Sequence, residues 1–411
     1  MRVSLDIAVI GCGVGGQAVA TLLADAGHRV TVVERFAAPR PVGAGLLLQP
    51  TGFSVLRKLG LDEEALALGA RIDGLDGRTA SGRRVLDLHY RNLHPKAFGL
   101  GIHRGALFEL LHGRLKRAAV RLLTSIEILS IEQDGAQAYL SDKTGSSHGP
   151  FDLAIVADGA HSTLRQRLMP EARAPLYPWG CVWTTVADDT PEFDGMLRQR
   201  VRGTGTMMGL LPVGRLPDDA PGMRRVTLFW SLPISGAAVQ PPADLDAWKS
   251  EASTLWPESK RLVERIETLS GFTAASYRHV AMPGWSDGAV VFMGDAAHGT
   301  SPQLGQGANL ALLDAYFLAA SLAREDRVGD ALVRFERLRV PPTRFYRHAS
   351  HLLTPFFQSN LKPLGWLRDA VMGAACHVPV ISTMMASTLA GTRRGWFGAT
   401  KLDDEGRYPL D

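Results

Sequence analysis

Three glycines and one acidic residue near the amino terminus have the spacing of a dinucleotide site. Gly11, Gly13 and Gly16 follow the apolar run 7–10, and Glu34 ends a second apolar run near the offset of about 20 residues typical of a ribose-binding acid. Gly11 permits a tight turn, Gly13 lets backbone N–H groups approach a pyrophosphate, and Gly16 lets the following helix pack close to the strand. Because Glu34 can accept hydrogen bonds from both ribose hydroxyls and would repel a 2′-phosphate, this βαβ pattern predicts FAD or NAD rather than NADP.

Two more carboxylates stand at the ends of apolar runs that are typical of buried strands. The pair Asp158-Gly159 ends one run, and the pair Gly294-Asp295 ends another. Together with the first glycine motif, in this order and at comparable spacing, they resemble the three fingerprints of the class A FAD monooxygenases. These are the flavoprotein aromatic hydroxylases built like para-hydroxybenzoate hydroxylase. The resemblance covers roughly residues 5–345 and favours FAD over NAD.

The stretch 294–309, GDAAHGTSPQLGQGAN, holds more glycines than a tight turn needs. In an FAD site, Asp295 can accept hydrogen bonds from the ribityl hydroxyls. Gly305 and Gly307 would bring bare backbone against the isoalloxazine ring, where any Cβ would collide. The N–H groups at the start of the following helix would then point at the flavin N1 and C2 carbonyl, where negative charge collects on reduction.

The resemblance implies one non-covalently bound FAD. Arg104 resembles the family arginine that reaches the FAD, and Asp158 matches a residue near the cofactor pyrophosphate. The alternative for Asp158 is that it mainly orients the helix that follows it. We expect Cys12 to be a small residue tolerated in the glycine loop rather than a covalent linkage site. The full set of predicted FAD contacts is Gly11, Gly13, Val14, Gly15, Gly16, Glu34, Arg35, Gly45, Arg104, Asp158, Gly294, Asp295, Gly305, Gly307, Ala308 and Asn309.

The activity implied by the resemblance is that of an NAD(P)H-dependent FAD monooxygenase, which hydroxylates a small aromatic or heteroaromatic compound through a flavin C4a-hydroperoxide. No second GxGxxG motif occurs in the chain, so NADH or NADPH would bind only transiently as the reductant. Two alternatives stay open at this point. One is an oxygen-independent flavin reductase or dehydrogenase of the same fold, and the other is a non-catalytic flavin-binding regulator.

Hydroxylation of this kind needs no nucleophilic side chain, so the sequence leaves the catalytic residues unassigned. His298 and Pro302 are the candidates in the glycine-rich stretch. A structural hydrogen bond explains His298 at least as well as a general base does.

The order of elements predicts an α/β composite with three parts. A Rossmann-like FAD-binding domain takes residues 1–75, 100–173 and 281–350, and an antiparallel-sheet substrate domain takes residues 76–99 and 174–280. Apolar side chains of the second domain are candidates to line a substrate pocket, and they are equally suitable as core residues: Trp183, Met207, Met208, Leu210 and Trp230. We select Trp183, Met208, Leu210 and Trp230 as the predicted substrate contacts. The third part, residues 351–411, is predicted to be a helical extension.

Composition limits the partners of the chain. A net charge of +4 with scattered basic residues does not indicate nucleic-acid binding, and three cysteines in no metal-binding spacing indicate neither a zinc site nor a disulfide framework. No apolar run reaches the ~18 residues of a membrane span, and no signal peptide is evident, so we expect a cytoplasmic monomer or homodimer. Packing of the extension onto the substrate domain is expected, and a membrane-facing or dimer surface remains the alternative.

Overall fold

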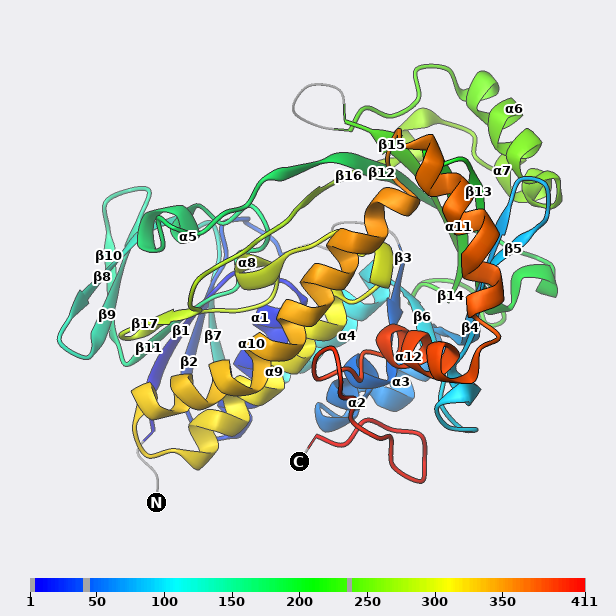
Figure 1. The fold of residues 1–411 in the computed structure, drawn as a ribbon. Coiled ribbons are helices and arrows are strands. Elements are labelled where there is room, and N and C mark those ends of the chain that lie inside the picture. Colours follow the sequence, from blue (N-terminus) through cyan, green and yellow to red (C-terminus); the bar gives the residue numbers. More distant parts are fainter. Residues whose placement is uncertain (1–3, 40–44, 235–238, 411) are drawn as a thin grey trace.

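The computed structural model describes residues 4–39, 45–234 and 239–410 (Figure 1). Its first sheet has six strands, and the strands from β18 to β7 run parallel. In spatial order the strands are β17 (Ser286–Asp287), β18 (Val290–Phe292), β11 (Leu153–Val156), β1 (Asp6–Ile10), β2 (Arg29–Val33) and β7 (Val120–Leu123). Ile10 pairs with Val33 on one side and with Val156 on the other. The segments that follow β1, β2 and β11 therefore leave the sheet at the same edge.

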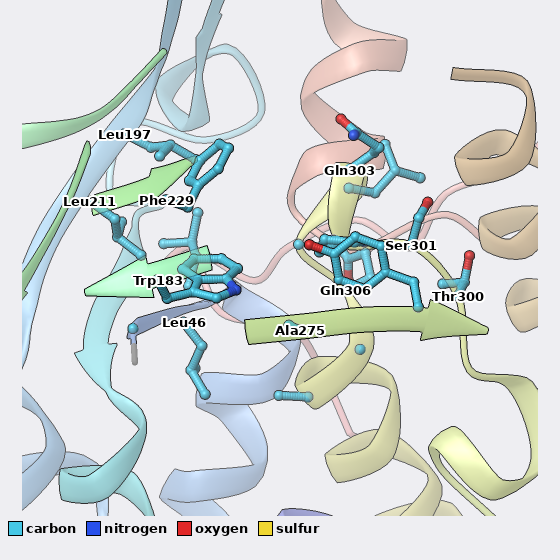
Figure 2. Close-up of a pocket in the computed structure, with 18 of the residues that line it drawn as sticks. Leu46, Trp183, Leu197, Leu211, Phe229, Ala275, Thr300, Ser301, Gln303 and Gln306 are labelled. Carbon is cyan, nitrogen blue, oxygen red and sulfur yellow. The ribbon is translucent and has the colours of Figure 1, made fainter. Parts of the chain in front are cut away.

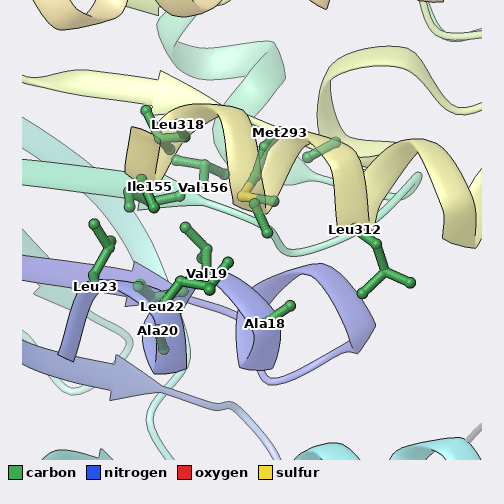
Figure 3. Close-up of a cluster of buried hydrophobic side chains, with 14 of the residues drawn as sticks. Ala18, Val19, Ala20, Leu22, Leu23, Ile155, Val156, Met293, Leu312 and Leu318 are labelled. Carbon is green, nitrogen blue, oxygen red and sulfur yellow. The ribbon is translucent and has the colours of Figure 1, made fainter. Parts of the chain in front are cut away.

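Helices cover this sheet and bury its apolar side chains. They are α1 (Val14–Asp25), α4 (Arg104–Arg117), α5 (Thr163–Leu168), α8 (Asp295–His298), α9 (Gly307–Arg324) and α10 (Val328–Leu353). Figure 3 shows Val19 and Leu23 of α1 beside Ile155 of β11, with Leu318 of α9 in the same cluster. Apolar residues of α1 lie on the face that these contacts require, which explains why the segment after Gly13 forms a helix here.

Smaller elements flank this sheet. A three-stranded antiparallel sheet consists of β8 (Ile128–Asp134), β9 (Gln137–Asp142) and β10 (Ser147–Phe151), and it projects to one side of the molecule in Figure 1. Helices α2 (Pro50–Lys58) and α3 (Asp62–Leu68) follow the strand β3 (Gly45–Leu48), and α2 packs against α9.

A nine-stranded sheet forms the second large unit. Its path is β16 (Thr273–Arg278), β12 (Leu176–Ala187), β15 (Arg225–Pro233), β14 (Thr206–Gly214), β13 (Gly195–Arg202), β4 (Ala70–Thr79), β6 (Gly99–His103) and β3 (Gly45–Leu48), with β5 (Arg84–His89) paired to β4. Every neighbouring pair is antiparallel except β13 and β4. The sequence prediction placed residues 1–75 and 100–173 in the FAD-binding domain, whereas β3, most of β6 and the first half of β4 belong to this sheet.

The two faces of the nine-stranded sheet have different neighbours. Helices α6 (Leu245–Leu255) and α7 (Lys260–Glu264) cover one face, where Trp230 meets Trp248 with ring centroids 5.8 Å apart. Side chains alternate along β14, so Met208 and Leu210 point to the α6 side while Met207 and Leu211 point to the other. The carboxyl-terminal helices α11 (Lys362–Ala375) and α12 (Pro379–Leu389) run along the β5 end of the sheet (Figure 1).

Candidate functional site

The first glycine loop contains glycines of two kinds. Gly11 has a φ of +105°, and a Cβ there would lie 2.6 Å from the Ala157 carbonyl oxygen. A Cβ on Gly16 would lie 2.0 Å from the Gly11 carbonyl oxygen, so both glycines are required by packing. No described atom lies within 4 Å of a Cβ built on Gly13, which precedes the first turn of α1. The backbone at Gly13 is therefore open to a ligand at a helix N-terminus, where an anion is stabilised.

Glu34 lies beside this loop at the end of β2. Its Oε2 accepts a hydrogen bond from the Cys12 N–H at 2.9 Å, and its Oε1 accepts one from the Phe36 N–H at 3.0 Å. Each oxygen keeps a further lone pair that a ribose hydroxyl can use. Burial, together with the Glu34 charge, raises the pKa of the Cys12 thiol to about 12. The thiol therefore stays protonated at neutral pH, which disfavours covalent attachment through this sulfur.

Asp158 follows β11 at the carboxyl edge of the six-stranded sheet, in an environment that disfavours its charged form. Its Oδ1 is buried and has no hydrogen-bond partner among the described residues. Burial raises the pKa of Asp158 to about 6, and the opposing effects of Ser162, Arg165 and Arg35 do not compensate. Ser162 also caps α5 by accepting a hydrogen bond from the Arg165 N–H at 3.1 Å. A carboxyl kept in such a position is typical of a functional site.

The glycine-rich stretch after β18 brings a second pair of charges to the site. Asp295 and Arg104 both line the main cavity, and the attraction of Asp295 opposes the lowering of the Arg104 pKa by burial. The Asp295 Oδ1 lies 3.7 Å from the position of a Cβ on Gly307. Asp295, Arg104 and the first turn of α9 therefore surround one region of the cavity.

At the start of α9 the backbone is exposed to the cavity. Gly305 has a φ of +61°, and a Cβ built on it would come no closer than 3.7 Å to a described atom, Gln49 Nε2. The first N–H groups of a helix have no acceptor within the helix. The Asn309 side chain fixes this turn by accepting from the Gln49 N–H at 2.8 Å and donating to the Leu47 carbonyl at 3.0 Å. The space is thus left open for a flat group with negative charge at its edge.

The cavity has a volume of about 320 Å³ and extends from this turn to the nine-stranded sheet (Figure 2). Figure 2 shows two walls of different character. The sheet wall is apolar and holds Leu46, Trp183, Leu197, Leu211 and Phe229, and the opposite wall holds Thr300, Ser301, Gln303 and Gln306. The flavin-side residues Arg104, Asp295, Gly305, Gly307 and Ala308 line the same cavity, together with Gly45.

The structure places only one of the four predicted substrate contacts in the wall of this cavity. Trp183 lines the cavity, but Met208, Leu210 and Trp230 are buried on the α6 face of the sheet. Their sequence neighbours Met207, Leu211 and Phe229 line the cavity instead. Neighbouring residues of a strand point to opposite faces of the sheet. A prediction that is shifted by one residue therefore names side chains on the face away from the cavity.

His298 is part of a buried ion network and does not line the cavity. Its Nε2 lies 2.5 Å from Asp314 Oδ2, and Arg339 Nε lies 2.7 Å from Asp314 Oδ1. Burial raises the pKa of Asp314, but His298 and Arg339 outweigh it and hold that pKa at about 2. The structural hydrogen bond therefore accounts for His298, whereas the other candidate, Pro302, does line the cavity.

Several cavity residues could not be found from the sequence motifs. Gln49 follows β3, and Gln358 and Leu389 come from the carboxyl-terminal extension, well beyond the glycine-rich stretch. None of the three lies in a motif, and only the pairing of distant elements brings them together. The remaining predicted FAD contacts, Val14, Gly15, Arg35 and Gly294, lie at the carboxyl edge of the six-stranded sheet.

The arrangement fits FAD. The open Gly13 loop and Glu34 would hold the pyrophosphate and the ribose, and the open turn at Gly305 and Gly307 would accept the isoalloxazine edge. The unpartnered Asp158 Oδ1 lies at the edge from which both loops leave the sheet.

Comparison with known proteins agrees with this assignment. Residues 4–333 match the family described as FAD binding domain. The 3-amino-4-hydroxybenzoate 2-monooxygenase of Streptomyces cremeus is 33% identical over 384 residues, which cover 86% of this chain and 88% of that protein. The 2-heptyl-3-hydroxy-4(1H)-quinolone synthase of Mycobacteroides abscessus is 30% identical over 335 residues, covering 81% and 86%. The crystal structure of PqsL from Pseudomonas aeruginosa has a TM-score of 0.75 at 25% identity, over 90% of this chain and 99% of that one.

Replacing Glu34 should weaken FAD binding. Glu34→Ala removes the acceptor for the ribose hydroxyls, and each charge-assisted hydrogen bond contributes about 1.5–3 kcal/mol. Fluorescence titration of the apoprotein should show a Kd for FAD at least tenfold higher in Glu34→Ala than in the wild type. Glu34→Gln should have a Kd between these two values. Glu132→Ala, an exposed carboxylate on β8, serves as the control. An unchanged Kd in Glu34→Ala would mean that this side chain does not contact the ribose.

Gly307 and Gly16 should respond differently to valine. The protein leaves room for a Cβ at Gly307 and its φ is not positive, so Gly307→Val should fold and bind ADP while losing most of its FAD affinity. Gly16→Val places a Cβ against the Gly11 carbonyl and should fail to fold. Circular dichroism and titration with ADP and FAD separate the two effects. Normal FAD binding by Gly307→Val would show that this turn does not meet the flavin.

Removing the charge of Asp158 should stabilise the apoprotein only at high pH. A folded-state pKa of about 6, above the ordinary 3.8, means that wild-type stability falls as the pH rises from 4 through 6. Asp158→Asn should therefore raise the free energy of unfolding by about 1–3 kcal/mol at pH 8 and leave it unchanged near pH 4. Urea unfolding at the two pH values is the measurement. An equal change in the free energy of unfolding at both pH values would show that the charge of Asp158 is not the cause.

Proposed function

Since the chain belongs to the FAD binding domain family and is an FAD-dependent aromatic monooxygenase, we propose that its own substrate is a small, uncharged aromatic or heteroaromatic ring compound. The observation that carries this proposal is the charge of the cavity wall. Among the described lining residues only Arg104, Asp295 and Tyr277 have ionisable side chains. The first two lie at the flavin side, so the sheet side offers no described cation to a substrate carboxylate.

Tyr277 does not act as a base in this cavity. Its hydroxyl donates a hydrogen bond to Cys181 Sγ at 2.7 Å, and burial raises its pKa well above the ordinary value. Burial also keeps the Cys181 thiol protonated, with its pKa raised to about 12. Both groups are therefore uncharged at neutral pH.

Two neutral amides line the cavity, and each has one polar atom without a partner among the described residues. Gln49 Oε1 accepts from the Tyr90 hydroxyl at 2.5 Å, which leaves the buried Gln49 Nε2 as a donor without a partner. Gln306 Nε2 donates to the Leu389 carbonyl at 2.7 Å, which leaves Gln306 Oε1 as an acceptor without a partner. Gln49 Nε2 is the described atom nearest to a Cβ on Gly305, so it can donate to a carbonyl or hydroxyl group bound at that turn. Gln306 Oε1 faces Gly391 and Thr51, which do not line the cavity. The names of both curated relatives describe rings that carry nitrogen and oxygen.

The residues of this chain have three tasks in the reaction. Bound FAD would supply the redox chemistry, taking electrons from NADH or NADPH and using O2 as the oxygen source. The N–H groups at the start of α9 would stabilise negative charge on bound FAD, and Arg104 and Asp295 would help to hold the cofactor at the same place. The apolar wall around Trp183 and Phe229 positions the ring and excludes water.

A matched pair of compounds tests the proposal. FAD-loaded protein should bind 3-amino-4-hydroxybenzamide at least tenfold more tightly than 3-amino-4-hydroxybenzoate, because burying an unpaired carboxylate costs several kcal/mol. The change in flavin absorbance on titration gives both Kd values, and stimulated NADH oxidation identifies productive binding. Gln199→Arg adds a cation to the cavity wall and should reduce the ratio of the Kd for the benzoate to the Kd for the benzamide. Tighter binding of the benzoate by the wild type would contradict a neutral substrate.

A further inference from the structure

Helix α11 exposes an apolar stripe to the solvent. The solvent-facing positions of α11 follow one helical stripe and, apart from Lys362 at its first position, all are apolar: Pro363, Trp366, Leu367, Ala370, Val371 and Ala374. Trp366 is 72% exposed, and Leu367 and Val371 are each 51% exposed. A surface helix of a globular protein normally turns such a stripe toward the core.

The inner side of α11 explains this orientation. Arg368 has a fully buried side chain that donates to the carbonyls of Gly203 at 2.8 Å and Phe356 at 2.7 Å. A Cβ on Gly373 would lie 2.4 Å from the Arg84 carbonyl oxygen, and one on Gly365 would lie 3.3 Å from Thr204 Cγ2. Only the glycine side of α11 can approach the sheet this closely. The apolar stripe is therefore held outward by specific contacts.

Exposed apolar residues also occur in the segment that follows α11. Val378 and Val380 precede and open α12, Val380 is 80% exposed, and Met384 follows one turn later. We call the six stripe residues and these three the C-terminal apolar face. From residue 363 to residue 390 only Arg368, Asp369 and His377 can carry charge near neutral pH, and Arg368 is buried.

The shape of this segment suits the surface of a bilayer rather than its interior. Within the described residues, no single helix is long and apolar enough to cross a membrane. The pair α11 and α12 has sufficient length and apolar composition only when taken together, and it bends by 106° at the break. A bent apolar pair with an exposed tryptophan is suited to lie in the boundary between lipid headgroups and acyl chains.

We infer that the C-terminal apolar face binds a lipid bilayer and holds the enzyme at the membrane surface. A second copy of the chain fits less well, because a stable interface takes about 20–30 residues from each side and this face has nine. Helix α12 also connects the face to the site, since Leu389 at its end lines the cavity. Membrane binding places the cavity near compounds that dissolve in lipid, whichever ring the enzyme accepts.

Vesicle sedimentation with the FAD-loaded protein tests the inference. The wild type should sediment with vesicles of phosphatidylcholine and with vesicles that also contain phosphatidylglycerol. High salt should change the bound fraction little, since almost no charge lies on the face. The double variant Leu367→Glu/Val371→Glu should lower the partition coefficient at least tenfold while keeping its flavin content. Leu66→Glu/Val333→Glu, which alters two exposed apolar residues elsewhere, should bind like the wild type.

Two results would overturn the inference. The first is a wild type that stays in the supernatant with both vesicle types, or that binds only anionic vesicles at low salt, as a protein of pI ≈ 9.0 can through its general charge. The second comes from light scattering after gel filtration: a wild-type dimer that Leu367→Glu/Val371→Glu converts to a monomer would assign the face to a second copy. Neither result affects the neutral-substrate proposal, which the ligand titration tests alone.

Discussion

The buried carboxylate of Asp314 connects the segments that form the flavin side of the cavity. It lies on α9 and accepts hydrogen bonds from the Gly294 N–H at 3.0 Å, from His298 on α8 and from Arg339 on α10. These contacts fix the end of β18 against α9, so the Asp295 side chain and the first turn of α9 face the same space. Breaking a buried ion pair by removing one partner is strongly destabilising, because the remaining charge is left without compensation. The network is thus a requirement of the fold that also sets the geometry of the site.

The glycines of the two loops are of two kinds, which differ in what a Cβ would meet. Where a Cβ would meet backbone, as at Gly11 and Gly16, glycine serves the packing of α1 on β1. At Gly13 and Gly307 no backbone of the described residues is close enough to require it. Helices α1 and α9 pack against each other, and the first turn of α9, but not that of α1, lines the cavity.

The sequence identified the cofactor as FAD, whereas it did not determine which side chains line the cavity, for physical reasons. Each βαβ motif is local, so the residues that follow β1 and β2 could be assigned from one continuous stretch. A substrate wall depends on the phase of a strand, and β14 places Met207 and Met208 on opposite faces. The membership of β3 and β6 in the nine-stranded sheet also depends on pairing between segments far apart in the sequence, which short-range periodicity does not determine.

The carboxyl-terminal extension shows a related limit of periodicity. The apolar stripe of α11 is visible in the sequence, and by the usual rule it predicts the buried face of a helix. In α11 the opposite face is buried, because Gly373 packs closely on the backbone of β5 and Arg368 donates to a carbonyl in the β13–β14 turn. Both contacts depend on segments that lie far from α11 in the sequence, so the periodicity of α11 cannot predict them. The direction in which an amphipathic helix faces is thus decided by the closest backbone contact rather than by hydrophobicity. A helix oriented in this way keeps its apolar face free for a partner outside the protein.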